Sequence, residues 1–139
     1  MIRKMEPHDL DACINIWLQS NLSAHDFIPV TYWSSHLDYM REVLPQAEVW
    51  VYCVADKVNA FIGMDGEYIA GLFVDEKFRS QDIGHRLINH VKSQHHRLTL
   101  CVFEKNQRAI NFYIREGFTD IKHRIDESTN EMEIVMQWS

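Results

Sequence analysis

Two short segments of the sequence carry residue types that could do chemistry together. The first, residues 72–84, joins an apolar stretch to an expected helix start, with Arg79 and Gly84 in or next to the connection. The first backbone N–H groups of a helix are unpaired and the dipole there is positive, so such a terminus suits a phosphate or pyrophosphate. Glycine would let the backbone approach the ligand, and arginine would add charge. Taken alone, the pattern also fits an ordinary strand-to-helix connection.

The second segment, residues 106–118, carries a phenol on an expected helix. Asn106 is suited to cap this helix, Gly117 fits just past its end, and Phe112 and Tyr113 lie between them. A phenol titrates near pH ~10, so Tyr113 keeps a proton that it can donate at neutral pH. Burial in a core is the more ordinary interpretation of both aromatic residues, and the segment alone does not decide between the two.

Hydrophobic periodicity indicates the elements that must position these segments. Strands are expected at residues 2–5, 49–54, 58–64, 67–74, 98–103, 118–125 and 132–138, and helices at about 7–18, 32–44, 83–91 and 106–116. Asp65-Gly66 between two apolar runs predicts a hairpin. The order β-α-α-β-β-β-α-β-α-β-β predicts an α+β protein with a mixed sheet, in which the strand–helix–strand unit of residues 68–103 is parallel.

Composition limits the class of protein. The 139 residues are 46% hydrophobic, which suits one packed domain spanning residues 1–139. The formal net charge is −6, and without a dense basic stripe we expect no nucleic-acid partner. No apolar run approaches the ~20 residues that cross a bilayer, and the first residues do not resemble a signal peptide, so we expect a cytoplasmic protein without a membrane partner. Cys13, Cys53 and Cys101 are expected to be reduced, and no residue spacing predicts a metal site.

Together the two segments resemble the GNAT (Gcn5-related N-acetyltransferase) superfamily. Its members carry a loop of the form R/Q-x-x-G-x-G/A after the fourth strand, and then Asn, Ala, Phe-Tyr and Gly-Phe. The residues that fit these patterns are Arg79, Ile83, Gly84, Asn106, Ala109, Phe112, Tyr113, Gly117 and Phe118. The expected elements match the family over residues 2–138, which implies a mixed, mostly antiparallel sheet of six to seven strands flanked by about four helices. Phe27-Ile28-Pro29 followed by Tyr32-Trp33 is similar to small bacterial members.

The resemblance implies an acyltransferase that moves an acetyl group from acetyl-CoA, as co-substrate, to an amine. Tyr113 would donate a proton to the departing thiolate. The backbone of residues 72–74 would pair with the pantetheine arm between two splayed strands, the loop of residues 79–85 would hold the pyrophosphate, and Asn106 would reach the pantetheine or the sulfur. The implied residues for acetyl-CoA are Leu72, Phe73, Val74, Arg79, Ser80, Gln81, Asp82, Ile83, Gly84, His85, Asn106 and Tyr113.

The general base and the acceptor are less defined. Glu67, acting through water, is the first candidate base and His25 is its rival, although either could be an ordinary surface residue. Phe27, Tyr32 and Trp33 would shape the acceptor pocket. That pocket suits a protein lysine, an N-terminal amine or a small-molecule amine equally well, in a monomer or a homodimer.

Asp82 departs from the family pattern, because the first glycine of the loop is expected at its position. Its carboxylate could repel the pyrophosphate, or it could turn inward and cap the helix. Asp82 also leaves open a second function, a catalytically poor GNAT-like module that binds acyl-CoA as a sensor or partner. An unrelated nucleotide-binding domain would need G-x-G-x-x-G or G-x-x-x-x-G-K-[ST], and neither occurs.

Overall fold

The computed structural model describes residues 1–79 and 81–139. The strands and helices follow the predicted order, except that one predicted helix is divided into two, and short 3₁₀ turns lie at Pro7–Asp9, Leu44–Gln46 and Glu76–Phe78. The elements are β1 (Ile2–Lys4), α1 (Leu10–Ala24), α2 (Val30–Ser34), α3 (Leu37–Val43), β2 (Glu48–Val54), β3 (Lys57–Asp65), β4 (Tyr68–Val74), α4 (Ile83–Lys92), β5 (Leu98–Phe103), α5 (Gln107–Arg115), β6 (Thr119–Asp126) and β7 (Glu131–Trp138). None of the helices in the described part of the chain is long and apolar enough to cross a membrane.

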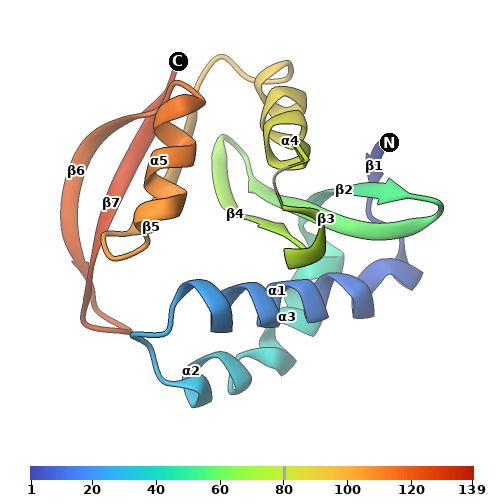
Figure 1. Cartoon of the computed structure of the whole chain (residues 1–139), viewed down its shortest axis with the longest axis horizontal. Helices are drawn as coiled ribbons and strands as arrows, with labels where there is room; N and C mark the ends of the chain where they lie inside the picture. Colours follow the sequence, from blue (N-terminus) through green and yellow to red (C-terminus); the bar gives the residue numbers. More distant parts are fainter. Residues whose placement is uncertain (80) are drawn as a thin grey trace.

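The strands form one twisted sheet (Figure 1). Its order is β1-β2-β3-β4-β5-β7-β6, seven strands in the described residues. Neighbouring strands are antiparallel except for β4 and β5, which are parallel. The mixed, mostly antiparallel sheet that the GNAT resemblance implies is therefore confirmed.

The parallel strands β4 and β5 share fewer paired residues than any other neighbouring strands in the described part of the chain. β4 pairs with β5 only at Tyr68↔Thr99 and Ile69↔Leu100. On its other edge β4 pairs with β3 along its whole length, up to Ala60↔Val74. Beyond Ile69 the two parallel strands therefore diverge, and one edge of β4 lacks a strand partner among the described residues.

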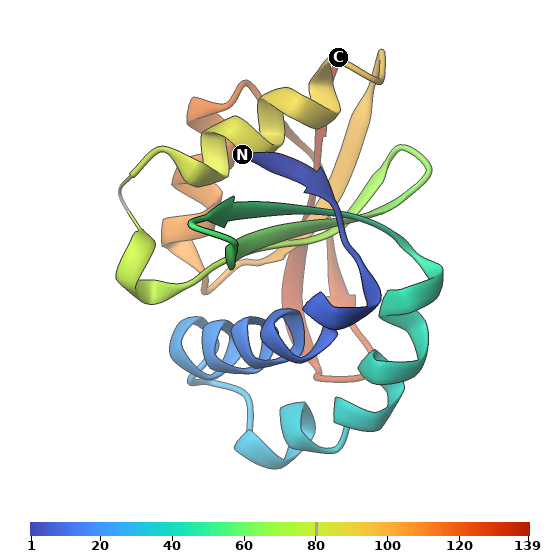
Figure 2. The ribbon, with the colours of Figure 1, turned by 90° about the vertical axis from the view of Figure 1, so that its right-hand side faces the viewer.

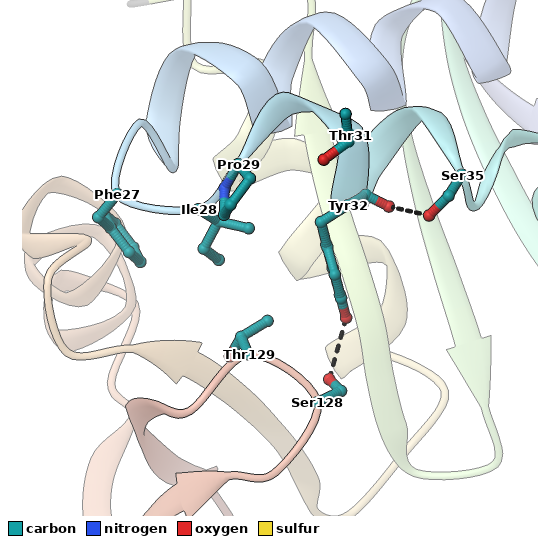
Figure 3. Close-up of a pocket in the computed structure, with 8 residues that line it drawn as sticks. All are labelled: Phe27, Ile28, Pro29, Thr31, Tyr32, Ser35, Ser128 and Thr129. Atoms are coloured by element: carbon teal, nitrogen blue, oxygen red, sulfur yellow. Dashed lines mark hydrogen bonds between the residues drawn. The ribbon is translucent and has the colours of Figure 1, made fainter.

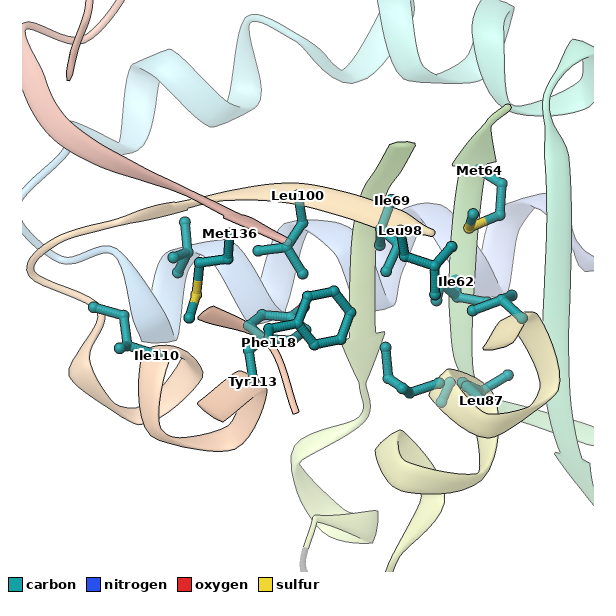
Figure 4. Close-up of a cluster of buried hydrophobic side chains, with 14 of the residues drawn as sticks. Ile62, Met64, Ile69, Leu87, Leu98, Leu100, Ile110, Tyr113, Phe118 and Met136 are labelled. Carbon is teal, nitrogen blue, oxygen red and sulfur yellow. The ribbon is translucent and has the colours of Figure 1, made fainter. Parts of the chain in front are cut away.

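Helices cover both faces of the sheet (Figure 2). Each face has its own core. Ile83, Leu87, Ile88 and Val91 form the apolar stripe that the sequence predicts on α4, and they pack with α5 against one face (Figure 4). Helices α1, α2 and α3 pack against the other face, over alternate residues of β2 and over Phe61. Alternation along the strands thus separates the two cores.

One predicted helix is divided in two. The sequence indicates a single helix over residues 32–44, whereas α2 begins at Val30 and a break at Ser35 and His36 precedes α3. The Tyr32 carbonyl would accept the His36 N–H in a continuous helix, but the Ser35 hydroxyl (2.8 Å) and the His36 ring bind it. The His36 N–H bonds the carbonyl of Trp33 instead. These local side-chain bonds compete with the helical ladder and end it.

Candidate active site

The divergence of β4 and β5 opens into a cleft of about 1080 Å³. Its walls come from β4, β5, the start of α4, α5, and the ends of α1 and α2. Of the site residues predicted from the sequence, it gathers Tyr32, Trp33, Leu72, Phe73, Val74, Arg79, Asp82, Ile83, Gly84, His85, Asn106 and Tyr113. Residues separated by up to 81 positions in the chain therefore meet at one site.

Four predicted site residues are not placed on this cleft. Glu67 and Gln81 are outside its lining, and Phe27 lines a neighbouring pocket. The Glu67 carboxylate is half-exposed and pairs with Arg97 over 3.2 Å, so the structure does not bring it together with Tyr113. Ser80 lies outside the described residues.

Tyr113 belongs to both the core and the cleft. Its ring packs edge-on against Phe112, with centroids 5.2 Å apart, and against Phe118 at 5.6 Å (Figure 4). Within the described residues its hydroxyl has no hydrogen-bond partner, while the side chain lines the cleft. Burial raises the pKa of Tyr113 above its ordinary value, which keeps the phenol protonated at neutral pH. The side chain is thus a rigidly held, protonated phenol.

The loop before α4 meets its helix at Asp82. The Asp82 carbonyl accepts the Arg86 N–H over 3.0 Å, which makes Asp82 the N-terminal cap position by its backbone. Its side chain makes no capping bond and is exposed on the cleft. The φ of Asp82 is +68°, in the left-handed region that glycine adopts most easily. This conformation explains why a glycine fits the position.

The arginines that line the cleft lie before α4 and on α5. Arg79 precedes α4, and Arg108 and Arg115 lie seven residues apart on α5. A spacing of seven is two helical turns, so both α5 arginines share the face that lines the cleft. His85, on α4, bonds Glu116 through Nδ1 over 2.8 Å. The two α5 arginines were not predicted from the sequence, although their spacing was readable.

A polar cluster beside the cleft, formed by Glu133, Arg124 and Cys101, was also not predicted from the sequence. Glu133 on β7 lines the cleft with 15% of its side chain exposed, and its Oε1 accepts the Arg124 Nε–H over 2.8 Å. Arg124 also donates to Sγ of Cys101 over 3.3 Å. Ile134 and Met136 are buried in the α4–α5 core, so alternation places Glu133 on the opposite face of the sheet. The sequence signal for this residue was its position: Glu133 is a charged residue between the apolar Met132 and Ile134 of an alternating strand.

His25 ends α1 and lines the cleft, but its environment is unsuited to a base. Burial lowers the pKa of His25 to about 4. Such a ring is too weakly basic to take a proton from a lysine-like ammonium, whose pKa is about 10.4.

A smaller pocket of about 400 Å³ adjoins the cleft through Tyr32, which lines both (Figure 3). It lies between α2 and the turn that joins β6 to β7, and the Tyr32 hydroxyl bridges the two by a 3.0 Å hydrogen bond to the hydroxyl of Ser128. Its lining residues are Phe27, Ile28, Pro29, Thr31, Tyr32, Ser35, Ser128 and Thr129.

Comparison with known proteins finds similarity to N-acetyltransferases. Residues 45–120 match the acetyltransferase (GNAT) domain family. The chain is 34% identical to the peptidyl-lysine N-acetyltransferase YiaC of Escherichia coli, over 99% of this chain and 96% of that protein. It is 31% identical to the peptidyl-lysine N-acetyltransferase YjaB of E. coli, over 84% of this chain and 80% of that one.

Solved structures share the fold along the whole chain. The solution structure of apo YjaB from E. coli superposes with a TM-score of 0.90 at 27% identity, over 99% of this chain and 96% of YjaB. An aminoglycoside 6'-N-acetyltransferase complexed with coenzyme A has the same fold, with a TM-score of 0.73 at 14% identity over 99% and 96% of the two chains.

Proposed function

Because the chain belongs to the GNAT family of acetyltransferases, we propose that this N-acetyltransferase moves an acetyl group from acetyl-CoA to the side-chain amine of a lysine in a protein. The observation that carries the proposal is the cleft, where a sheet opening, a protonated phenol and three arginines meet. Two relatives named as peptidyl-lysine N-acetyltransferases support the choice of acceptor. Residues 1–139 would act as one catalytic domain, and the supply of acetyl-CoA would place the reaction in the cytoplasm.

The residues present fit acetyl-CoA as a substrate. The edge of β4 beyond Ile69 has backbone groups that could pair with the amides of a pantetheine arm as an added strand would. Arg79, Arg108 and Arg115 supply positive charge along the cleft, which suits the phosphates. The cleft volume suits a ligand of this size.

The reaction needs one nucleophile, one electrophile and one proton donor. The neutral amine nitrogen of the acceptor attacks the thioester carbonyl carbon, the new C–N bond forms, and the C–S bond breaks. Tyr113 would give its proton to the departing thiolate, and an N–H on the β4 edge would stabilise the charge that develops on the carbonyl oxygen. After the attack the nitrogen loses a proton, which passes to solvent or to the phenolate of Tyr113.

Glu133 would attract the acceptor from the opposite face of the sheet. Its Oε1 is held by Arg124, which leaves Oε2 available for the ammonium group of a lysine. A lysine amine has a reference pKa of about 10.4 and must lose a proton before it attacks. We therefore propose that Glu133 binds the ammonium form and that solvent takes its proton near the carboxylate, and we assign no role in this step to Glu67.

The test is an acetyl-transfer assay with matched acceptors. The protein and acetyl-CoA are incubated with an N-terminally blocked peptide containing one lysine, with the same peptide carrying arginine instead, with an unblocked lysine-free peptide, and with a small diamine. Release of free thiol gives the rate, and mass spectrometry locates the acetyl group. We expect transfer to the blocked lysine peptide. Transfer only to the free N-terminus or the diamine would contradict the acceptor, and acetyl-CoA binding without any transfer would contradict the reaction.

A further inference from the structure

A chain of side-chain hydrogen bonds crosses the cleft from α1 to α5. At its centre, Nδ1 of His25 lies 3.0 Å from Oδ1 of Asn21, and Nε2 of His25 lies 3.0 Å from Nδ2 of Asn106. Asn21 is 4% exposed, and His25 and Asn106 both line the cleft. The contacts therefore join the end of α1 to Asn106, the residue that caps the start of α5.

The hydrogen bonds that Asn21 and Asn106 make away from His25 determine which of their atoms donate to the ring and which accept. Asn21 donates from Nδ2 to the Trp17 carbonyl over 2.9 Å, so its Oδ1 faces the ring and accepts. Asn106 accepts the Ala109 N–H on its Oδ1 over 3.3 Å, so its Nδ2 faces the ring and donates. His25 must then carry its proton on Nδ1 and a lone pair on Nε2. An imidazolium would set two donors against each other at Asn106.

The ring of His25 is also held from both sides. It stacks on Trp33 with centroids 5.5 Å apart, and it meets Phe27 and Phe103 edge-on at 5.7 Å and 5.0 Å. These contacts bury the ring, which lowers the pKa of His25 to about 4 and agrees with the neutral form that the hydrogen bonds require. The neutral tautomer is thus fixed by geometry and supported by burial.

We propose that His25 is a positioning residue for acetyl-CoA, which holds the amide of Asn106 so that its second Nδ2–H can bind a carbonyl of the pantetheine arm. Asn106 caps α5, the helix that carries Tyr113, so the same contact also steadies the start of that helix. This inference rests on the proposed function for its ligand. It assigns His25 to the co-substrate and not to proton transfer.

Two substitutions of His25, to glutamine and to asparagine, form a matched pair. The amide oxygen of glutamine can reach the place of Nε2 and accept from Asn106, so His25→Gln keeps the proposed contact. The shorter His25→Asn reaches only the place of Nδ1, so it keeps the contact to Asn21 and loses the one to Asn106. His25→Phe keeps the ring packing and loses both bonds. His96→Phe, at an exposed position outside the cleft lining, is the control for the change of residue type.

Loss of one hydrogen bond is worth about 0.5–1.5 kcal/mol, which is about two- to tenfold in affinity. We therefore expect His25→Asn and His25→Phe to raise the KM for acetyl-CoA and the Kd for CoA about two- to tenfold, with little change in the KM for the amine. His25→Gln should stay within about twofold of the wild type. In an Asn106→Ala background, His25→Phe should add little further loss, because the two residues act through one bond.

A second measurement does not depend on the variants. The ring nitrogen chemical shifts of His25 in the intact protein report which nitrogen carries the proton, and we expect the neutral Nδ1–H tautomer from pH ~5.5 upward. Melting temperatures of all variants show whether a loss of affinity follows from unfolding.

Three results would overturn the proposal. They are an Nε2–H or doubly protonated ring near neutral pH, unchanged CoA affinity in folded His25→Phe, and additive losses with Asn106→Ala. A kcat lowered about 10²-fold or more in all three variants, with CoA affinity unchanged, would instead make His25 a proton-transfer residue. CoA binding needs no acceptor, so these measurements still decide the question if no lysine is acetylated.

Discussion

A Cβ atom on Gly84 would lie 3.2 Å from Cζ of Phe112. This is tighter than ordinary carbon contacts, so the glycine lets the start of α4 rest directly against α5. Phe112 in turn packs on Tyr113. The contact therefore connects the proposed phosphate-binding end of the cleft to the proposed proton donor.

We expect Gly84→Val to weaken CoA binding and to lower the melting temperature, because the added side chain must displace the Phe112 ring. Overpacking of this kind typically costs about 1–3 kcal/mol. Calorimetric titration with CoA and thermal unfolding measure the two effects. Phe112→Leu in the same protein should restore part of both by making room. Gly63→Ala is the matched control, since a Cβ there meets no atom within 4 Å; equal losses in the two variants would contradict the steric explanation.

Tyr113→Phe should keep CoA affinity and lower kcat by about 10²- to 10⁴-fold, the usual contribution of a positioned general acid. The side chain keeps its packing against Phe118, so the fold should survive. Steady-state kinetics and CoA titration separate the two quantities, and Tyr39→Phe at an exposed site is the control. An unchanged kcat, with chemistry shown to limit the rate, would remove Tyr113 from the mechanism.

The environment of Tyr113 also predicts a pH dependence. Burial disfavours the phenolate and raises the pKa of Tyr113 above its ordinary value of about 10. The phenol is therefore protonated below pH ~10, and it begins to lose its proton only at higher pH. We expect the wild-type kcat to show no fall due to Tyr113 between pH 7 and pH ~10. An alkaline fall in this range that disappears in Tyr113→Phe would contradict the raised pKa of Tyr113.

Glu133→Gln should raise the KM for the lysine peptide about 10- to 100-fold and leave the KM for acetyl-CoA unchanged. The basis is loss of a charged hydrogen bond, worth about 1.5–3 kcal/mol. Glutamine keeps the size of the side chain and an oxygen that can accept from Arg124. Glu42→Gln, exposed on α3, is the control. If the KM for acetyl-CoA rises instead, Glu133 serves the thioester side of the cleft.

Periodicity in the sequence was sufficient for the element order and for the α4 stripe, because 3.6- and two-residue repeats record which face is buried. It did not show where β4 and β5 part, since both strands are apolar through the divergence and only pairing distinguishes them. It also read residues 32–44 as one helix, because the Tyr32 carbonyl is taken by side chains that no apolar pattern reports.

The lining of the cleft was predictable where a family motif contains the residue. Arg79, Gly84, Asn106 and Tyr113 all line the cleft as the resemblance implies. Glu133 was not predicted, because its role depends on pairing between β6 and β7 that places Arg124 beside it. His25 was considered as a base, and only its burial and its two amide neighbours indicate a different role.

Arg108→Ala and Arg115→Ala should each weaken CoA binding more than binding of a pantetheine analogue without phosphates. The α5 pair faces the cleft, where a cation gains most from a multiply charged ligand. The loss should shrink as salt is added, because exposed charges are screened within about 10 Å at 0.1 M. Titrations at two salt concentrations measure this, with Lys57→Ala as the exposed control. Equal losses for CoA and the analogue would show that these arginines do not bind phosphates.

The last prediction concerns Asp82, whose carboxylate is exposed on the cleft and makes no capping bond. Asp82→Asn removes the charge and keeps a residue that tolerates the left-handed conformation, so it should tighten CoA binding with little change in stability. Asp82→Gly should tighten binding equally and also stabilise the fold, because glycine adopts a φ of +68° without the steric cost of a Cβ, about 1 kcal/mol. Asp82→Ala should bind CoA like the other two but lose stability.

The three substitutions separate charge from backbone conformation. All of them remove the carboxylate charge, but the new residues differ in how easily they adopt the left-handed conformation. Removal of repulsion between charges about 4 Å apart is worth about 1–4 kcal/mol, so a gain of about tenfold in CoA affinity at low salt is expected for all three, and it should fall with added salt. Stability should rank Gly above Asn and Asp, and Ala last. If only Asp82→Gly binds more tightly, strain in the loop and not the carboxylate weakens the site. If affinity changes by less than twofold in every variant, the carboxylate points away from the phosphates and the loop tolerates it.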